Sequence, residues 1–155
     1  MHFASRLRAI AIALAISIPS FADAGILSGP VVNPATGSTY YLLERASWVR
    51  SQFEARELGG NLATVETAAE DQWLRDRFLN FGGTGRALWI GLHETGEAGT
   101  FEWIIGSDSE FRAWADGQPN HALGGQQYVA ITPGGFLRAE GWNDWADGDA
   151  DFFGT

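Results

Sequence analysis

The sequence predicts an α+β domain made of two helices, several short strands and long loops. Two stretches carry apolar residues at the spacing of one helix face, and each lies between a helix-capping residue and a Gly-Gly pair. Short β-favouring runs are separated from them by glycine-containing turns. The seven tryptophans and ten phenylalanines suit a loop-rich domain with an aromatic core. Because the chain has no cysteine, packing alone must stabilise that core.

The first 24 residues are typical of a signal peptide. Arg6 and Arg8 precede an apolar run, residues 9–18, that is shorter than the roughly 18 residues a membrane span needs. Ala22 and Ala24 are the small residues that signal peptidase requires, which predicts cleavage before Gly25. An uncleaved anchor is the alternative interpretation. We therefore expect a secreted protein, located in the periplasm, at the cell surface or in the medium, without membrane insertion of the mature domain.

The charge and length of the chain restrict its partners and its organisation. A net charge of −9 at pH 7 argues against nucleic acid or an anionic membrane as the partner and favours cations. The length after the signal peptide fits one domain. Residues 25–38, rich in Gly, Pro and Asn, are expected to form an N-terminal lead-in, and residues 39–155 the domain itself.

Two helices are expected in the first half of the domain, after a β-favouring run at residues 39–43. Ser47 can cap the first helix, which Gly59-Gly60 ends and whose apolar residues are Trp48, Val49, Phe53 and Leu58. Residues 67–70, Thr-Ala-Ala-Glu, form a capping box that opens the second helix. Gly82-Gly83 ends that helix, and its apolar residues are Trp73, Leu74, Phe78 and Phe81.

The second half of the domain is expected to hold three strands and one long loop. The β-favouring runs are residues 87–92, 100–105 and 127–132. Residues 106–126 form a connection that is long for a compact domain, and loops of this length are more often functional than incidental.

Several motifs occur in an order that resembles the C-type lectin-like domain. They cover about Tyr40 to Asp144, and the Trp-Ile-Gly-Leu strand together with the Gln-Pro-Asn and Trp-Asn-Asp triplets is the most specific part. The matching residues are Trp48, the run 59–65, Glu70, the run 89–92, Trp103, Trp114, Gln118-Pro119-Asn120 and Trp142-Asn143-Asp144.

This resemblance implies a fold of two helices flanking small antiparallel sheets, with a long loop that binds a calcium ion and, on it, a carbohydrate or glycoconjugate. A cis peptide before Pro119 would point its neighbours' side chains the same way. Carried across by position, the ligand-binding residues are Gln118, Asn120, Gln126, Asn143 and Asp144. Of these, Gln118, Asn120, Asn143 and Asp144 are the expected calcium ligands.

Two glutamines lower the calcium affinity expected of this site. Gln126 stands where sugar-binding members carry an acidic residue, and Gln118 replaces the glutamate of mannose-type sites, so only Asp144 brings a formal charge. Because charged ligands raise calcium affinity, we expect weak binding, at about millimolar calcium or above. Gln-Pro-Asn also mixes the mannose-type and galactose-type signatures, which leaves sugar preference open.

The scaffold departs from the family pattern at both the cysteines and the C-terminus. Leu58, Tyr128 and Asp147 stand near positions where members have disulfides, so packing must replace them. The family continues past the positions of Phe152-Phe153 into a strand that pairs with the first one, which predicts a truncated closing strand here. An exposed edge on the first strand would follow.

The remaining acids and histidines are interpreted as structural or solvated groups, with assistance by Asp147 or Asp149 to calcium bound at Asp144 as the alternative. The acids of residues 147–151 lack the glycine and closing glutamate of an EF-hand and are interpreted as a solvated tail. His93 and His121 are interpreted as surface residues, with ligand contact as the alternative for His121 because it follows Asn120. Trp145 is interpreted as core, with sugar stacking as its alternative. No catalytic motif is present, so we expect no enzyme. The competing function is a calcium-independent module that binds a protein or a surface.

Overall fold

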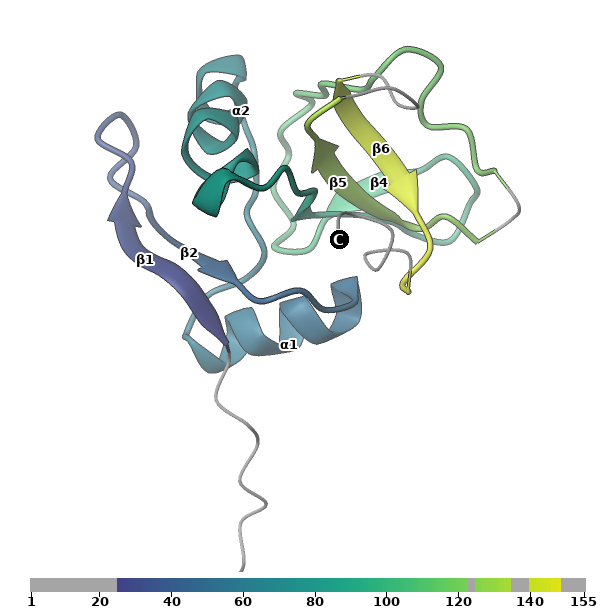
Figure 1. Cartoon of the computed structure of the whole chain (residues 1–155). Coiled ribbons are helices and arrows are strands. Elements are labelled where there is room, and N and C mark those ends of the chain that lie inside the picture. The colour runs from purple at the N-terminus through teal and green to yellow at the C-terminus, as the bar shows by residue number, and fades with distance from the viewer. Residues whose placement is uncertain (1–24, 123–124, 135–139, 149–155) are drawn as a thin grey trace, which may run out of the picture.

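The computed structural model describes residues 25–122, 125–134 and 140–148, so the predicted signal peptide lies outside the described residues. Figure 1 shows the helices and a two-stranded sheet on one side of the molecule, and a larger sheet with the long loop on the other. Within the described ranges, no helix is both long and apolar enough to cross a membrane. The elements are β1 (Ile26–Val32), β2 (Thr39–Leu43), α1 (Trp48–Glu57), α2 (Ala68–Leu74), β3 (Leu88–Glu94), β4 (Phe101–Trp103), β5 (Tyr128–Thr132) and β6 (Gly141–Trp145).

Helix α1 begins and ends as its local sequence predicts, but it turns a different face to the core. The Ser47 side chain accepts a hydrogen bond from the Arg50 N–H, and Gly59 adopts a positive φ just after the helix. Trp48 is buried and donates its indole N–H to the Ile90 carbonyl at 2.7 Å. Val49 and Phe53 are 50% and 38% exposed, so they contribute less to the core than expected.

Helix α2 begins at the predicted cap but without the reciprocal bond of a capping box. The Thr67 hydroxyl accepts from the Glu70 N–H at 3.2 Å, whereas the Glu70 carboxylate accepts from the Glu66 N–H and the Tyr40 hydroxyl. Burial and the Glu70 carboxylate raise the pKa of Tyr40. A π-helical turn, Arg75–Leu79, and a 3-10 turn, Phe81–Gly83, extend the helix to the predicted stop.

The strands form two antiparallel sheets, ordered β1-β2 and β4-β3-β5-β6. This confirms the α+β fold class, and β3, β4 and β5 lie at the three predicted runs. The lead-in expected at 25–38 is wrong in part, because residues 26–32 form β1 and pair with β2. Strand β6, which carries the Trp-Asn-Asp triplet, pairs with β5. The predicted truncation of a closing strand concerns residues 149–155, which lie outside the described residues.

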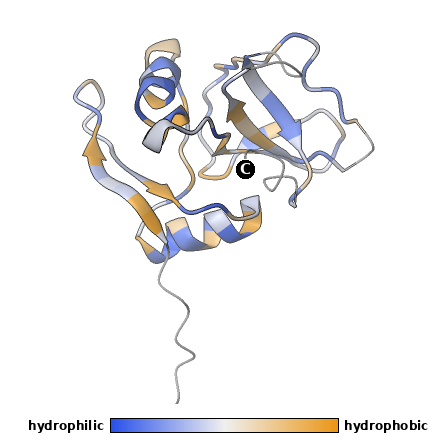
Figure 2. Cartoon of the chain, viewed as in Figure 1, coloured by the Kyte–Doolittle hydropathy of each residue, from blue (hydrophilic) through white to orange (hydrophobic). Residues whose placement is uncertain are grey.

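The core lies between the helices and the larger sheet and is centred on aromatic side chains. Trp142 is fully buried and meets the rings of Trp103, Phe111 and Trp114 edge-on. Trp145 is also buried, in agreement with its core interpretation. Figure 2 shows β5 as hydrophobic and much of the loop before it as hydrophilic. The sheet therefore buries apolar surface while the loop stays compatible with water.

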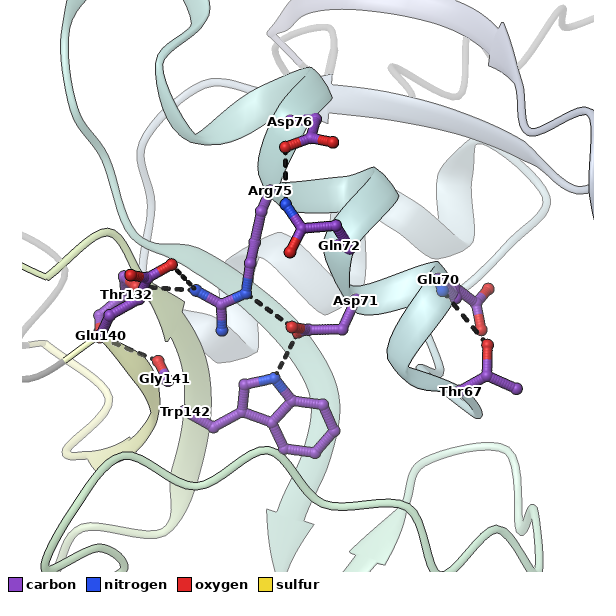
Figure 3. A network of polar contacts seen from close by, with 10 residues as sticks. All are labelled: Thr67, Glu70, Asp71, Gln72, Arg75, Asp76, Thr132, Glu140, Gly141 and Trp142. Atoms are coloured by element: carbon purple, nitrogen blue, oxygen red, sulfur yellow. Dashed lines mark hydrogen bonds and ion pairs between the residues drawn. The ribbon is translucent and has the colours of Figure 1, made fainter.

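Polar and aromatic contacts link the elements of this cysteine-free scaffold. The rings of Tyr128 and Trp48 stack with their centroids 4.6 Å apart. The Asp147 carboxylate accepts a hydrogen bond from the Val49 N–H at 2.9 Å. Asp147 is thus a contact of α1 rather than part of a free acidic tail. Figure 3 shows a second link, in which the buried Asp71–Arg75 pair of the second helix meets β5 and β6.

Candidate functional site

The long loop is attached to strand β6 on its way to β5. Backbone hydrogen bonds join Ala115 N–H to the Trp142 carbonyl at 2.9 Å and Trp142 N–H to the Ala113 carbonyl at 2.7 Å. The Gln118–Pro119 peptide that follows is cis, which confirms the prediction for Pro119. The Gln-Pro-Asn turn therefore leaves the sheet from a fixed point beside the Trp-Asn-Asp strand.

Asp144 is the anchor of this turn. It lies on β6 opposite Val129 and is fully buried. Its two carboxylate oxygens accept hydrogen bonds from the backbone N–H groups of Asn120 at 3.1 Å and His121 at 2.9 Å. The structure thus brings two of the predicted site residues, Asn120 and Asp144, into direct contact across 24 positions of sequence.

His121 is not the surface histidine that the sequence predicts. Its side chain is 33% exposed, and its Nδ1 lies 3.4 Å from Glu94 Oε1 and 3.6 Å from Asp144 Oδ2. Its ring stacks on Phe101 of β4, with centroids 5.9 Å apart and an interplanar angle of 17°. Its φ of 48° is a left-handed conformation that is uncommon for non-glycine residues, although histidine adopts it more readily than most.

Sequence reasoning missed the role of His121 and of its partner Glu94. The only signals were the position of His121 next to Asn120 and that of Glu94 two residues after the Trp-Ile-Gly-Leu motif. Glu94 ends β3, and its Oε1 also accepts from the Gly99 N–H at 2.6 Å. A pairing of residues 27 positions apart needs the tertiary structure.

The other predicted ligands differ in what their polar atoms contact. The Gln118 and Gln126 side-chain carbonyl oxygens are buried and have no hydrogen-bond partner in the described part of the chain. Asn120 is exposed, and its Oδ1 accepts from the Ala122 N–H at 2.9 Å. Asn143 is half-buried beside Asp144 on β6. Gln118 and Gln126 therefore have buried carbonyl oxygens without a partner among the described residues, whereas the Asn120 amide is exposed.

These residues are a poor match for a strong calcium site. Calcium takes six to eight oxygen ligands, and carboxylates raise its affinity. Asp144, the one carboxylate in the predicted set, already accepts two N–H groups, while Gln118 and Gln126 add only neutral oxygens. Among the described residues, no three His, Asp or Glu side chains are grouped so that they could hold a metal ion.

Comparison with known proteins gives the family. The sequence matches the Lectin C-type domain over residues 44–150, so the chain belongs to the C-type lectin domain family. It is 30% identical over 84 residues to a hepatic lectin of Gallus gallus, covering 53% of this chain and 38% of that protein. It is 31% identical over 112 residues to C-type lectin domain family 4 member M of Hylobates lar, covering 70% of this chain and 26% of that protein.

Solved structures agree with this assignment. Human lithostathine is 26% identical with a TM-score of 0.58, over 67% of this chain and 71% of that one. The chain spans well under half the length of the two curated relatives.

Proposed function

We propose that this protein is a secreted carbohydrate-binding module and that its binding surface is the turn 118–122 together with Gln126, Asn143 and Asp144. The observation that carries the proposal is the pair of buried, unpartnered carbonyl oxygens of Gln118 and Gln126. Buried acceptors of this kind are costly unless a donor reaches them. Sugar hydroxyls are such donors, and membership of the C-type lectin domain family supports a sugar as the ligand.

Calcium has a minor part in this proposal. If an ion binds, Gln118, Asn120, Asn143 and Asp144 would hold it, and it would supply a positive centre that attracts sugar hydroxyl oxygens. Neutral ligands dominate this set, so we expect affinity no better than about millimolar. Any cation at Asp144 also competes with two backbone N–H groups and with His121 Nδ1 for the same carboxylate.

A calcium-independent interaction module is the second candidate, and one observation favours it. The Asp144 carboxylate is engaged in holding the turn, which is a structural role that needs no metal. In this case the turn presents its exposed Asn120 and neighbouring groups to a protein or a surface. The two candidates differ in whether glycans bind at all.

Export supports either candidate, because glycoconjugates and cell surfaces lie outside the cytoplasm. The predicted cleavage before Gly25 would release a protein that begins at β1. Amino-terminal sequencing of the exported protein checks this. A mature protein that begins at Gly25 supports the assignment, whereas one that retains residues 1–24 identifies the segment as an anchor.

A glycan array probed with the exported protein tests the proposal. It should be run in chelator and in calcium at about 10 mM, which exceeds the weakest class of protein sites. Gln126→Ala is the test variant, and Gln127→Ala is its control because Gln127 is an exposed neighbour of the same type. Glycan binding that Gln126→Ala weakens and Gln127→Ala leaves unchanged supports the site. Absence of glycan binding in both buffers would contradict carbohydrate binding and favour the calcium-independent interaction module.

A further inference from the structure

We propose that His121 is a positioning residue that orders the turn 118–122 without a metal ion, because its imidazole contacts both the Glu94 and the Asp144 carboxylates. The inference deepens the proposed function, on which it rests for the role of the turn in binding. It assigns a task to a residue outside the expected ligand set.

The carboxylates of Glu94 and Asp144 lie close to the same atom of His121. The Asp144 side chain is fully buried and that of Glu94 is 12% exposed, and both have an oxygen within 3.6 Å of one atom, His121 Nδ1. Two poorly hydrated carboxylates that face a common point repel one another and need a cation or N–H donors between them. Calcium sites neutralise such carboxylates with the ion itself but need six to eight oxygen ligands, more than these two side chains supply.

Backbone N–H groups of the chain donate hydrogen bonds to both carboxylates. The Asp144 carboxylate accepts hydrogen bonds from the backbone N–H groups of Asn120 and His121. The Glu94 carboxylate accepts one from the Gly99 N–H. The imidazole then occupies the space that both carboxylates face. Protein groups therefore satisfy the carboxylates that a metal ion would neutralise.

The His121 side chain contacts several elements at once. Its contacts reach the end of β3 through Glu94, β4 through Phe101 and β6 through Asp144. These contacts hold His121 in a left-handed conformation, with a φ of 48°. The turn is thus joined to three strands of the larger sheet through one side chain.

Hydrogen exchange of the amides of residues 118 and 120–122, measured by mass spectrometry, tests the inference in chelator and in about 10 mM calcium. His121→Asp is the diagnostic variant, because aspartate tolerates the same positive φ but removes the imidazole and adds a third carboxylate. Asp116→Ala is the control, as an exposed residue of the same loop. Exchange in β5 shows whether each variant stays folded.

We expect equal protection of the wild-type turn in both buffers. His121→Asp should exchange roughly tenfold faster in chelator and recover protection in calcium, whereas Asp116→Ala should behave as wild type. Three results overturn the inference: wild-type protection that requires calcium, unchanged protection in His121→Asp with chelator, or a loss in that variant that calcium does not restore. The exchange experiment contains no sugar, so its outcome is independent of glycan binding. A negative glycan array would contradict the proposed function without contradicting the role of His121.

Discussion

Trp142 donates its indole N–H to Asp71 Oδ1 at 2.7 Å, although the two residues lie 71 positions apart. The other oxygen of Asp71 accepts from Arg75 Nε at 2.6 Å, and an Arg75 terminal N–H reaches the Thr132 carbonyl at 3.2 Å. One carboxylate therefore fastens α2 to β6, the strand that also carries Asp144. The position of the candidate site depends on this buried network.

Removing that carboxylate should strongly destabilise the domain. Asp71→Ala leaves the Arg75 charge buried and Trp142 Nε1 without its acceptor, and breaking a buried pair in this way costs about 3 to 5 kcal/mol. Asp76→Ala is the matched control, because Asp76 is exposed and its carboxylate accepts a hydrogen bond from the Gln72 side chain one helical turn away. Urea unfolding measures both. Similar stability losses in the two variants would contradict the prediction.

The stability of the domain should fall in alkaline solution because of Tyr40. Its pKa is raised from 10.0 by burial and by Glu70, so the folded protein holds the phenolic proton more tightly than the unfolded chain does. This stabilisation is complete below pH 10 and is lost as the pH rises above it. Tyr40→Phe should flatten the decrease of unfolding free energy above pH 10, as followed by urea titrations at several pH values.

Tyr41→Phe is the control for the alkaline experiment, since Tyr41 is an adjacent tyrosine that is 41% exposed. It should retain the wild-type decrease. If Tyr40→Phe and Tyr41→Phe show the same pH dependence, the decrease has another source.

Adding charge at the two unpartnered glutamines should create calcium dependence. The double variant Gln118→Glu with Gln126→Glu adds two carboxylates to the predicted ligand-binding residues, and calcium affinity increases with the number of charged ligands. We expect calcium at about 10 mM to raise its thermal midpoint clearly more than it raises that of the wild type. Gln118→Glu with Gln127→Glu adds the same charge with one group outside the site. An equal calcium response in both double variants would show that net charge, and not the site, is responsible.

Gly141 should tolerate no side chain, because the loop crosses it closely. A Cβ at Gly141, with φ 142°, would lie 2.5 Å from the Ala115 nitrogen, at the point where the loop bonds to Trp142. Gly117→Ala isolates the backbone strain, since Gly117 also has a positive φ but nothing within 4 Å of an added Cβ. We expect a loss of about 1 kcal/mol for Gly117→Ala and several times more for Gly141→Ala in urea unfolding. Equal losses would mean that the close approach adds no cost.

Local sequence was sufficient for much of the fold. Helix α1 begins after Ser47 and ends just before Gly59, and helix α2 begins after Thr67. The cis peptide precedes Pro119, as predicted. These features were predictable because caps and Xaa-Pro bonds act within a few residues. The Trp-Ile-Gly-Leu run forms a strand, and the ordered motifs indicated the family. Strand β1 was missed, since Gly29-Pro30 interrupts its β-favouring pattern and pairing with β2 overrides that local signal.

The environment of each side chain at the site was decided only by the tertiary structure. Asn120 and Asp144 could be named from their motifs, but whether Asp144 is free to bind a ligand depends on N–H donors from a loop 23 and 24 positions away. The same holds for His121, whose contacts with Glu94 and Asp144 join segments that only the sheet brings together. Sequence motifs specify which polar groups are present, whereas burial and long-range packing determine which of them are already satisfied.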